Sequence, residues 1–371
     1  MVQSGLRAAV CMVMILGACV TALGCGTSEP SAPSTQTTTA QSATTEPAPP
    51  STETGVTPSS SEPINLGMAL EFTDHAASAM VALEKGWFAE EGLDIAAYES
   101  YVTGVDLAAA LARGDIQVAY MCLVPAISVR ANGGVPIKVV AGTHLYGYGL
   151  VANPAKVATP ADLAKPDVKI ACTQPGASAD ILLQRICTDG GLPTADIMGK
   201  VQRMNPPSQV LALQAGAVDA CLVPEHWATL AESLGFTMLL TAQDMWDQLQ
   251  GSVLVVKEDL IRDRPDVVEK LVEVTQRADE WMNANPDEAA AIIASRLTAT
   301  GQSVFPEKAA EAAAKLDITP ELIKRSMARL TYATSVDPAQ VQATIDYMDQ
   351  LGYLKQKITA DTLLDLTFLS H

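Results

Sequence analysis

From Ile64 to the end of the chain, short apolar runs alternate with amphipathic stretches. The short runs predict strands at 64–69, 93–98, 116–120, 168–171 and 253–256. Apolar residues spaced three and four apart predict helices at 76–84, 105–112, 181–187, 266–283, 286–297, 307–315, 319–330 and 339–351. Strands that alternate with helices predict an α/β fold with a largely parallel sheet.

The first residues follow a different pattern. Arg7 precedes an apolar run that ends near Leu23, which predicts a secretory signal over residues 1–24. The run is too short to indicate a membrane span with assurance. Its end resembles a bacterial lipobox. In that resemblance, signal peptidase cuts before Cys25, and the Cys25 thiol carries a lipid. Polar sequence starts directly after Cys25 and favours it over Cys19, the alternative; an ordinary signal with incidental cysteines is the third interpretation.

Beyond the candidate lipid site, residues 25–62 contain almost only Gly, Ser, Thr, Pro, Ala, Gln and Glu. This composition buries too little apolar surface to offset the entropy of chain ordering. It predicts a disordered, lipid-anchored linker that reaches on the order of 100 Å when extended. A plain disordered tail fits the composition equally well.

Composition limits the classes of function. The 371 residues suggest about two domains, and 24 Lys and Arg against 42 Asp and Glu give a net charge of −18. That charge argues against nucleic-acid binding and against a surface that adheres to anionic lipid. The seven cysteines show no CxxC pair and no zinc-site spacing, and no catalytic triad or phosphate loop stands out. We therefore predict no catalytic residue, cofactor or metal site, and expect buried free thiols at Cys122, Cys172, Cys187 and Cys221.

Two segments of the chain echo each other. Residues 110–117 resemble 212–219, and the tetrapeptide Cys-Leu-Val-Pro follows each, at Cys122 and at Cys221. Both copies are typical of a helix, a glycine cap, a buried strand and a proline that opens the next helix. The echo predicts two similar α/β halves that face each other across a cleft. The alternative is that such units resemble one another through composition alone.

Several segments resemble the substrate-binding proteins of ABC importers, in the nitrate/sulfonate/taurine and thiamine-precursor family. The strongest is 81–95, and the others are 110–115, 132–138, 212–219 and 347–353, so the resemblance covers about 64–371. It implies a type II periplasmic-binding-protein fold, with lobe 1 at 63–152 and 250–371 and lobe 2 at 153–249. It also implies an extracytoplasmic receptor that closes on a small molecule and docks on an ABC transporter permease, held to the membrane by its lipid.

In such a fold, ligands lie beyond the C-terminal ends of strands, near helix N-termini. The residues expected there are Phe72, Thr73, Asp74, His75, Thr103, Gly104, His144, Thr173, Ser178, Glu225, His226 and Trp227. Hydroxyl and imidazole groups would donate hydrogen bonds, rings would stack, and the carboxylates would bind an amine; each side chain could instead cap a helix or fill the core. Because none of these residues is Lys or Arg, nitrate and sulfonate are disfavoured, and neutral, aromatic or amine-bearing ligands stay open.

Two other classes share this architecture. One is an enzyme, but the cysteine-rich motif of thiamine-precursor synthases is absent, and the export signal disfavours menaquinone-pathway enzymes. The other is an anchored sensor domain, which the sequence does not distinguish from a transport receptor.

Overall fold

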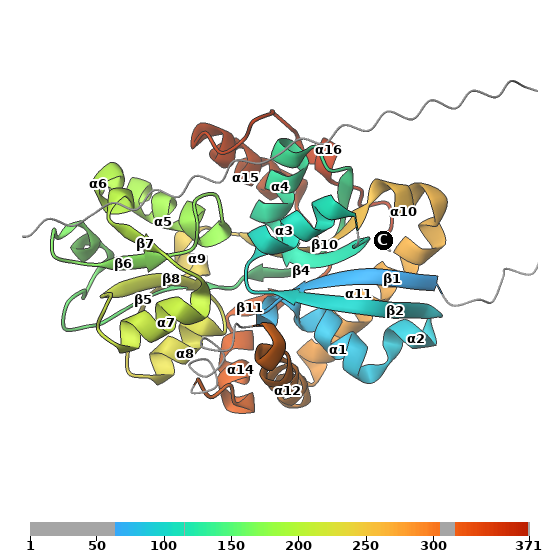
Figure 1. Cartoon of the computed structure of the whole chain (residues 1–371), viewed down its shortest axis with the longest axis horizontal. Helices are drawn as coiled ribbons and strands as arrows, with labels where there is room; N and C mark the ends of the chain where they lie inside the picture. Colours follow the sequence, from blue (N-terminus) through green and yellow to red (C-terminus); the bar gives the residue numbers. More distant parts are fainter. Residues whose placement is uncertain (1–63, 115, 305–315, 370–371) are drawn as a thin grey trace, which may run out of the picture. The chain divides into compact units, whose positions relative to one another are not determined.

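The computed structural model describes residues 64–114, 116–304 and 316–369. The predictions for the signal, for Cys25 and for the linker, together with the helix at 307–315, lie outside these residues. The described chain forms two separate sheets with helices on both faces of each (Figure 1). None of the described helices is long and apolar enough to cross a bilayer.

The first sheet has six strands in the order β11-β4-β10-β3-β1-β2. Their bounds are Ile64–Glu71 (β1), Leu93–Tyr101 (β2), Val118–Cys122 (β3), Ile137–Tyr146 (β4), Gln250–Lys257 (β10) and Leu330–Tyr332 (β11). β1 pairs in parallel with β2 and β3, whereas β10 runs antiparallel to β3 and β4, and β11 runs antiparallel to β4.

The second sheet has five strands in the order β7-β6-β8-β5-β9. Their bounds are Tyr148–Ala152 (β5), Ile170–Cys172 (β6), Val201–Arg203 (β7), Ala220–Pro224 (β8) and Thr237–Thr241 (β9). β6 pairs in parallel with β7 and β8, and β5 runs antiparallel to β8 and β9.

The chain passes from one sheet to the other twice. The first passage is the single residue Gly147 between β4 and β5, and the second leads into β10 at Gln250. Residues 148–152 therefore pair in the second sheet, although the sequence-based boundary after residue 152 groups them with the first. The passage is not visible in the sequence, because the apolar residues continue from β4 into β5. In the structure, Tyr146 (φ 68°) and Gly147 (φ 87°) have left-handed backbone conformations at this point.

The prediction of a largely parallel sheet is wrong, because both sheets are mixed. β1, β3, β6 and β8 end at the edge where the chain changes sheets, whereas β5 and β10 begin there. A strand that begins at this edge is antiparallel to neighbouring strands that end there. The crossings therefore cause the antiparallel pairings of β5 and β10.

Helices cover the two faces of the first sheet because its strand residues alternate between them. Leu70 and Tyr120 belong to one hydrophobic cluster, whereas Ala69 and Met121 belong to another. The first cluster includes α1 (Ala77–Lys85), α2 (Trp87–Glu90), α11 (Pro265–Ala284), α12 (Pro286–Val304) and α14 (Pro320–Met327). The second includes α3 (Gly104–Arg113), α4 (Leu123–Gly133), α15 (Pro338–Gln350) and α16 (Ala360–Leu363), while α10 (Glu258–Asp263) follows β10 (Figure 1).

The second sheet is covered in the same way. α7 (Pro206–Gln214) and α8 (Trp227–Ser233) join the first cluster, and α5 (Ser178–Asp189), α6 (Thr194–Gly199) and α9 (Ala242–Met245) join the second. Two short 3₁₀ turns, η1 (Asp74–Ala76) and η2 (Pro160–Ala164), complete the described elements. The four cysteines of the folded part are buried and free.

The echoed tetrapeptides adopt different structures, which corrects the predicted strand-then-proline pattern. In the first copy Cys122 ends β3, and the next three residues begin α4. In the second copy the whole tetrapeptide from Cys221 to Pro224 lies within β8. The strands begin at Val118 and Ala220, similarly placed after the glycines, so the longer spacing in the first copy moves Cys122 to the strand end.

Candidate functional site

A small cavity of about 40 Å³ lies where the strand ends of the two sheets meet. We call it the cleft cavity. Its lining combines residues at the ends of β1, β2, β3 and β8 with the start of β5 and the first residues of α5 and α7. The lining residues are Glu71, Thr73, Val102, Thr103, Gly104, Cys122, Pro125, Tyr148, Thr173, Ala177, Ser178, Ala179, Pro206 and Pro224. This is the edge at which ligands bind in open α/β sheets.

The N-terminus of α3 packs directly against the Glu71 side chain. Thr103 is the N-cap of α3, and its hydroxyl oxygen accepts the backbone N–H of Asp106 at 3.2 Å. A Cβ atom on Gly104 would lie 2.2 Å from Glu71 Oε1 and 2.7 Å from Pro125 Cγ. Only glycine permits this close approach, which brings the partial positive charge of a helix N-terminus to the buried carboxyl group.

Glu71 and Cys122 form a buried pair at the cavity wall. The backbone N–H of Cys122 donates to Glu71 Oε1 at 2.9 Å, and its thiol donates to Oε2 at 2.8 Å. The Tyr148 hydroxyl lies 2.9 Å from the same sulfur. Burial raises the pKa of Glu71 despite its bonds to Cys122. Burial, and then Glu71 itself, raises the pKa of the Cys122 thiol well above its ordinary value.

No Lys or Arg belongs to the residues that line the cleft cavity. Arg203 lies beside one lining residue, but its Nη1 donates to the Thr173 carbonyl at 2.7 Å and to Asp180 Oδ1 at 2.6 Å. The cavity therefore offers a carboxyl group, a thiol and hydroxyl groups, without a cationic side chain to balance an anion.

Two histidines stand behind the pair. His75 Nδ1 lies 3.6 Å from Cys122 Sγ, and its Nε2 lies 2.7 Å from the Gly147 carbonyl oxygen. The His144 ring packs against the His75 ring in a tilted arrangement, with centroids 4.4 Å apart and 51° between the ring planes. Burial lowers the pKa of His75 to about 4, although the Asp74 charge opposes this shift. Burial and the adjacent His75 lower the pKa of His144 well below its usual range.

A second buried polar group joins η1 to α8 and α14. Asp74 Oδ1 accepts the His226 backbone N–H at 3.0 Å, and Asp74 Oδ2 accepts the Ser326 hydroxyl. Burial favours a higher pKa for Asp74, but His226, His75 and Ser326 outweigh it and the net pKa is lowered. None of these side chains lines the cleft cavity.

Glu225 and its neighbours extend this polar group. Glu225 Oε2 accepts the Thr229 hydroxyl at 2.6 Å, and its Oε1 lies 3.5 Å from Arg329 Nη1. Burial raises the pKa of Glu225 to about 7, against the effect of Thr229 and Arg329. Next to it, the Trp227 ring lies 6.2 Å from the Phe72 ring, and both are nearly fully buried.

The structure divides the expected ligand contacts into two sets. Thr73, Thr103, Gly104, Thr173 and Ser178 line the cleft cavity. The others are buried beside it without reaching its surface, and they are Phe72, Asp74, His75, His144, Glu225, His226 and Trp227. Sequence reasoning missed Glu71 and the role of Cys122 in the cavity wall. A single carboxylate that ends an apolar strand was a signal for Glu71.

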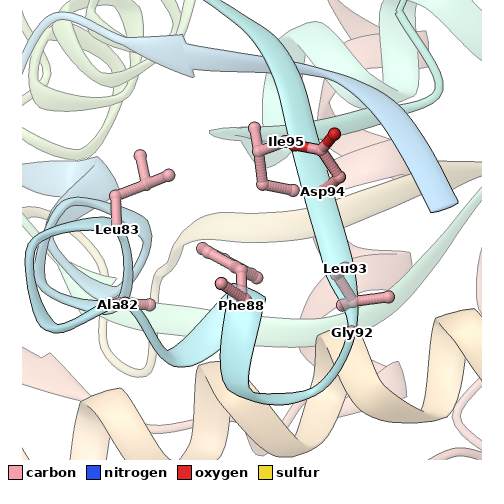
Figure 2. Close-up of a pocket in the computed structure, with 9 residues that line it drawn as sticks. Ala82, Leu83, Phe88, Gly92, Leu93, Asp94 and Ile95 are labelled. Carbon is pink, nitrogen blue, oxygen red and sulfur yellow. The ribbon is translucent and has the colours of Figure 1, made fainter. Parts of the chain in front are cut away.

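A second hollow lies away from this edge. It measures about 320 Å³ and is lined mainly by apolar side chains, among them Leu83 of α1, Phe88 of α2 and Ile95 of β2 (Figure 2). It lies at the start of β2, so it is far along the strand from the end that borders the cleft cavity. Asp94 supplies its one charged side chain, and the few converging polar groups that mark a ligand site are missing from its lining.

A large part of this chain matches a known protein family. The model of the NMT1-like family matches residues 58–298. The nitrate/nitrite binding protein NrtA of Synechococcus elongatus is 26% identical in an alignment 270 residues long, which covers 64% of this chain and 60% of that protein. The chain thus aligns with about three fifths of that relative's length.

Solved structures show the same fold. The alkanesulfonate-binding protein SsuA of Xanthomonas axonopodis pv. citri, bound to MOPS, superposes with a TM-score of 0.66 at 20% identity, covering 82% of this chain and 99% of that one. The periplasmic nitrate-binding protein NrtA of Synechocystis PCC 6803 gives a TM-score of 0.66 at 18% identity, covering 81% and 86%. The periplasmic-binding-protein fold and the resemblance to ABC import substrate-binding proteins are therefore confirmed.

Proposed function

This chain belongs to the NMT1-like family, and we propose that it is an extracytoplasmic receptor that binds one small molecule in the cleft cavity and delivers it to an ABC importer. The observation that carries the proposal is the lining of the cleft cavity, which comes from both sheets. Relatives of the chain are substrate-binding proteins for nitrate and sulfonate, which supports the same class of function.

We define lobe 1 as the first sheet with its helices and lobe 2 as residues 148–249. Hydrogen bonds join the lobes around the cavity. Gln174 Nε2 donates to Thr103 Oγ1 at 3.3 Å, the Tyr353 hydroxyl donates to Asp180 Oδ2 at 2.6 Å, and the His226 N–H donates to Asp74. Their presence supports a closed arrangement, which must open for a ligand to enter.

The lining favours a ligand other than a simple anion. Glu71 borders the cavity and no Lys or Arg does, so a nitrate or sulfonate group would meet a carboxyl group without a compensating cation. A neutral or cationic ligand suits this surface better. The cavity volume of about 40 Å³ is larger than the roughly 10–15 Å³ that one water molecule needs, but it holds only a few atoms. A larger ligand requires the two lobes to move apart.

A binding screen on the full chain tests this function. A ligand at 100 times its dissociation constant adds about 2.7 kcal/mol to the free energy of unfolding, which raises the melting temperature visibly. The panel holds nitrate, alkanesulfonates, taurine, pyrimidines and small amines. We expect a neutral or cationic compound to stabilise the chain and the simple anions to leave it unchanged. Saturable stabilisation by nitrate or an alkanesulfonate would overturn the proposed ligand class.

We also propose the N-terminal anchor, with the signal at 1–24, a lipid on Cys25 and a tether over 25–62. The order of apolar run, cysteine and polar tether in the sequence supports it. Replacing Cys25 with Ala should release the protein from the membrane fraction of its host, whereas Cys19→Ala should leave it bound. The reverse pattern would assign the lipid to Cys19, and release by neither substitution would argue against a lipid anchor.

A further inference from the structure

Three metal-ligating side chains converge at the wall of the cleft cavity. One oxygen of Glu71, one nitrogen of His75 and the sulfur of Cys122 all lie within 4.8 Å of one another, and all three residues are buried. Glu71 ends β1, His75 lies in η1, and Cys122 ends β3. Cys122 is 47 residues from His75 and 51 from Glu71 along the chain, so no local spacing in the sequence reveals the group.

The His75 ring is held in the tautomer that a metal requires. A carbonyl oxygen only accepts hydrogen bonds, so the 2.7 Å contact with Gly147 places the proton of the neutral ring on Nε2. Nδ1 then carries the free lone pair, and it is the nitrogen that faces Cys122 Sγ. A histidine whose other N–H donates to a backbone carbonyl is the usual arrangement around a bound metal.

The distances suit zinc. Zinc–sulfur bonds of about 2.3 Å and zinc–nitrogen bonds of about 2.0–2.1 Å at a tetrahedral angle place the two ligand atoms about 3.6 Å apart. His75 Nδ1 and Cys122 Sγ are 3.6 Å apart. The Glu71 oxygen is closer to the sulfur, at 2.8 Å, where it accepts the thiol proton. Replacing that proton with an ion would move the carboxylate outward by less than an ångström.

The charges of the group also favour a divalent cation over a reactive thiolate. A carboxylate beside the sulfur opposes a thiolate, so Cys122 is poorly placed to act as a nucleophile. The lining of the cavity supplies no cationic side chain that could stabilise both anions. A Zn²⁺ ion bound by the Glu71 carboxylate, a Cys122 thiolate and a neutral His75 would form a group without net charge.

Two neighbours complete the surroundings. The Tyr148 hydroxyl lies 2.9 Å and the Ser252 hydroxyl 3.5 Å from the Cys122 sulfur, as partners that would orient a thiolate. His144, which packs on His75, has a fully buried Nε2 with no hydrogen-bond partner among the described residues. His144 Nε2 therefore contributes no hydrogen bond to the network of described residues around Cys122.

We propose that Glu71, His75 and Cys122 bind a zinc ion at the wall of the cleft cavity, with a fourth position that opens toward the cavity. A water molecule or an uncharged donor atom of a small ligand fills that position, for which the cavity has room. The ion's charge is already balanced by Glu71 and Cys122, so the preference for a ligand other than a simple anion stays the same. The inference names an ion for the cavity of the proposed function, but it does not require that the protein serve an importer.

Zinc titration of the full chain tests the site. Cys11, Cys19 and Cys25 are first replaced by Ser, so that the N-terminal thiols contribute nothing, and the remaining thiols are kept reduced. Calorimetry should show one Zn²⁺ per chain and release of protons to the buffer. Co²⁺ in place of zinc should produce a thiolate-to-metal charge-transfer absorption. Absence of stoichiometric zinc binding by this chain would overturn the proposal.

Matched variants locate the site. Glu71→Gln, His75→Gln and Cys122→Ser should each weaken zinc binding by about 100-fold or more, beyond the loss that second-shell changes cause. Cys221→Ser is the control, because Cys221 occupies the same tetrapeptide but lies inside β8 away from the cavity. Each variant is checked for a cooperative melting transition. If one of the three zinc-ligand variants fails to fold, the folded ones decide the test, because they should lack the Co²⁺ absorption.

Failure of this inference is distinguishable from failure of the proposed function. Zinc affinity that all three ligand variants retain, or that Cys221→Ser abolishes, would overturn the site. A chain that binds no zinc but is stabilised by a compound of the screen keeps its receptor function without the ion. A chain that binds zinc through these residues while no compound stabilises it supports the ion site alone.

Discussion

His75 Nε2 lies 2.7 Å from the carbonyl oxygen of Gly147, and this hydrogen bond joins η1, which follows β1, to the residue where the chain leaves the first sheet. The same carbonyl accepts the backbone N–H of Glu225 at 2.8 Å, from the end of β8. The wall of the cleft cavity and the first crossing between the lobes are thus linked through one peptide group.

Gly147→Ala should destabilise the protein more than a left-handed backbone alone explains. Gly147 has φ +87°, and a Cβ there would lie 2.7 Å from His75 Nε2 and 3.1 Å from His144 Cε1. We expect a loss of roughly 3 kcal/mol in urea unfolding, from strain and overpacking together. Gly191→Ala is the control, because Gly191 has φ +62° with open space around it, and should lose only about 1 kcal/mol. Equal losses would argue against the close approach at Gly147.

Glu225 should make the protein less stable as pH rises through neutrality. Burial raises its folded pKa to about 7 from 4.5, with Thr229, Arg329 and Asp74 as the groups that act on it. Between these values the folded state keeps a proton that the unfolded state has lost, so the contribution is complete below pH 4.5 and disappears above pH 7. It amounts to about 3 kcal/mol. Unfolding free energies from pH 4 to 8 should decline relative to Glu225→Gln, and parallel curves would contradict the assignment.

Trp227 should contribute to the stability of the fold and not to ligand binding. Its ring is 1% exposed, packs near Phe72 and lies outside the cavity lining. Trp227→Ala should therefore lower the unfolding free energy by about 3–5 kcal/mol, as deletion of a large buried ring does. A variant that keeps its stability but loses affinity for a ligand from the screen would instead support the direct contact that the sequence suggests.

Tyr353 should affect ligand affinity through lobe closure. Its hydroxyl donates to Asp180 across the lobes at 2.6 Å. Tyr353→Phe removes this bond and the 2.9 Å bond that the hydroxyl accepts from Gln184 Nε2, also across the lobes. At about 0.5–1.5 kcal/mol each, their loss should lower the affinity for a ligand by roughly 5- to 150-fold. Tyr120→Phe is the matched control, because it removes a 2.8 Å bond to Thr275 inside lobe 1. If both variants bind equally well, closure does not depend on the Tyr353 bonds.

The sequence predicts the local elements well where the periodicity is strong. The expected helices at 76–84 and 266–283 correspond to Ala77–Lys85 and Pro265–Ala284. The strand directions and the passage at Gly147 are not readable in this way, because they depend on which sheet a continuous apolar run joins.

The cavity shows the same limit. Thr103 and Ser178 could be placed at its wall because residues that follow a strand and start a helix share one edge of a sheet. Glu71 and Cys122 are strand residues within apolar surroundings, and their partnership is a tertiary contact over 51 residues. Conversely, His226 has the position of a ligand contact in the sequence, but its backbone N–H bonds Asp74 and its ring packs on Trp227.

Filling each of the two hollows with an aromatic side chain shows which of them binds the ligand. Ser178→Phe places a ring in the cleft cavity, whereas Ala89→Trp places one in the apolar hollow of Figure 2. Calorimetry gives the dissociation constant of the compound that the screen identifies, for both variants and the unaltered chain, once each shows a cooperative melting transition. We predict that Ser178→Phe abolishes binding and that Ala89→Trp leaves it unchanged. Binding that survives Ser178→Phe and is lost in Ala89→Trp would contradict the assignment of the cleft cavity as the ligand site.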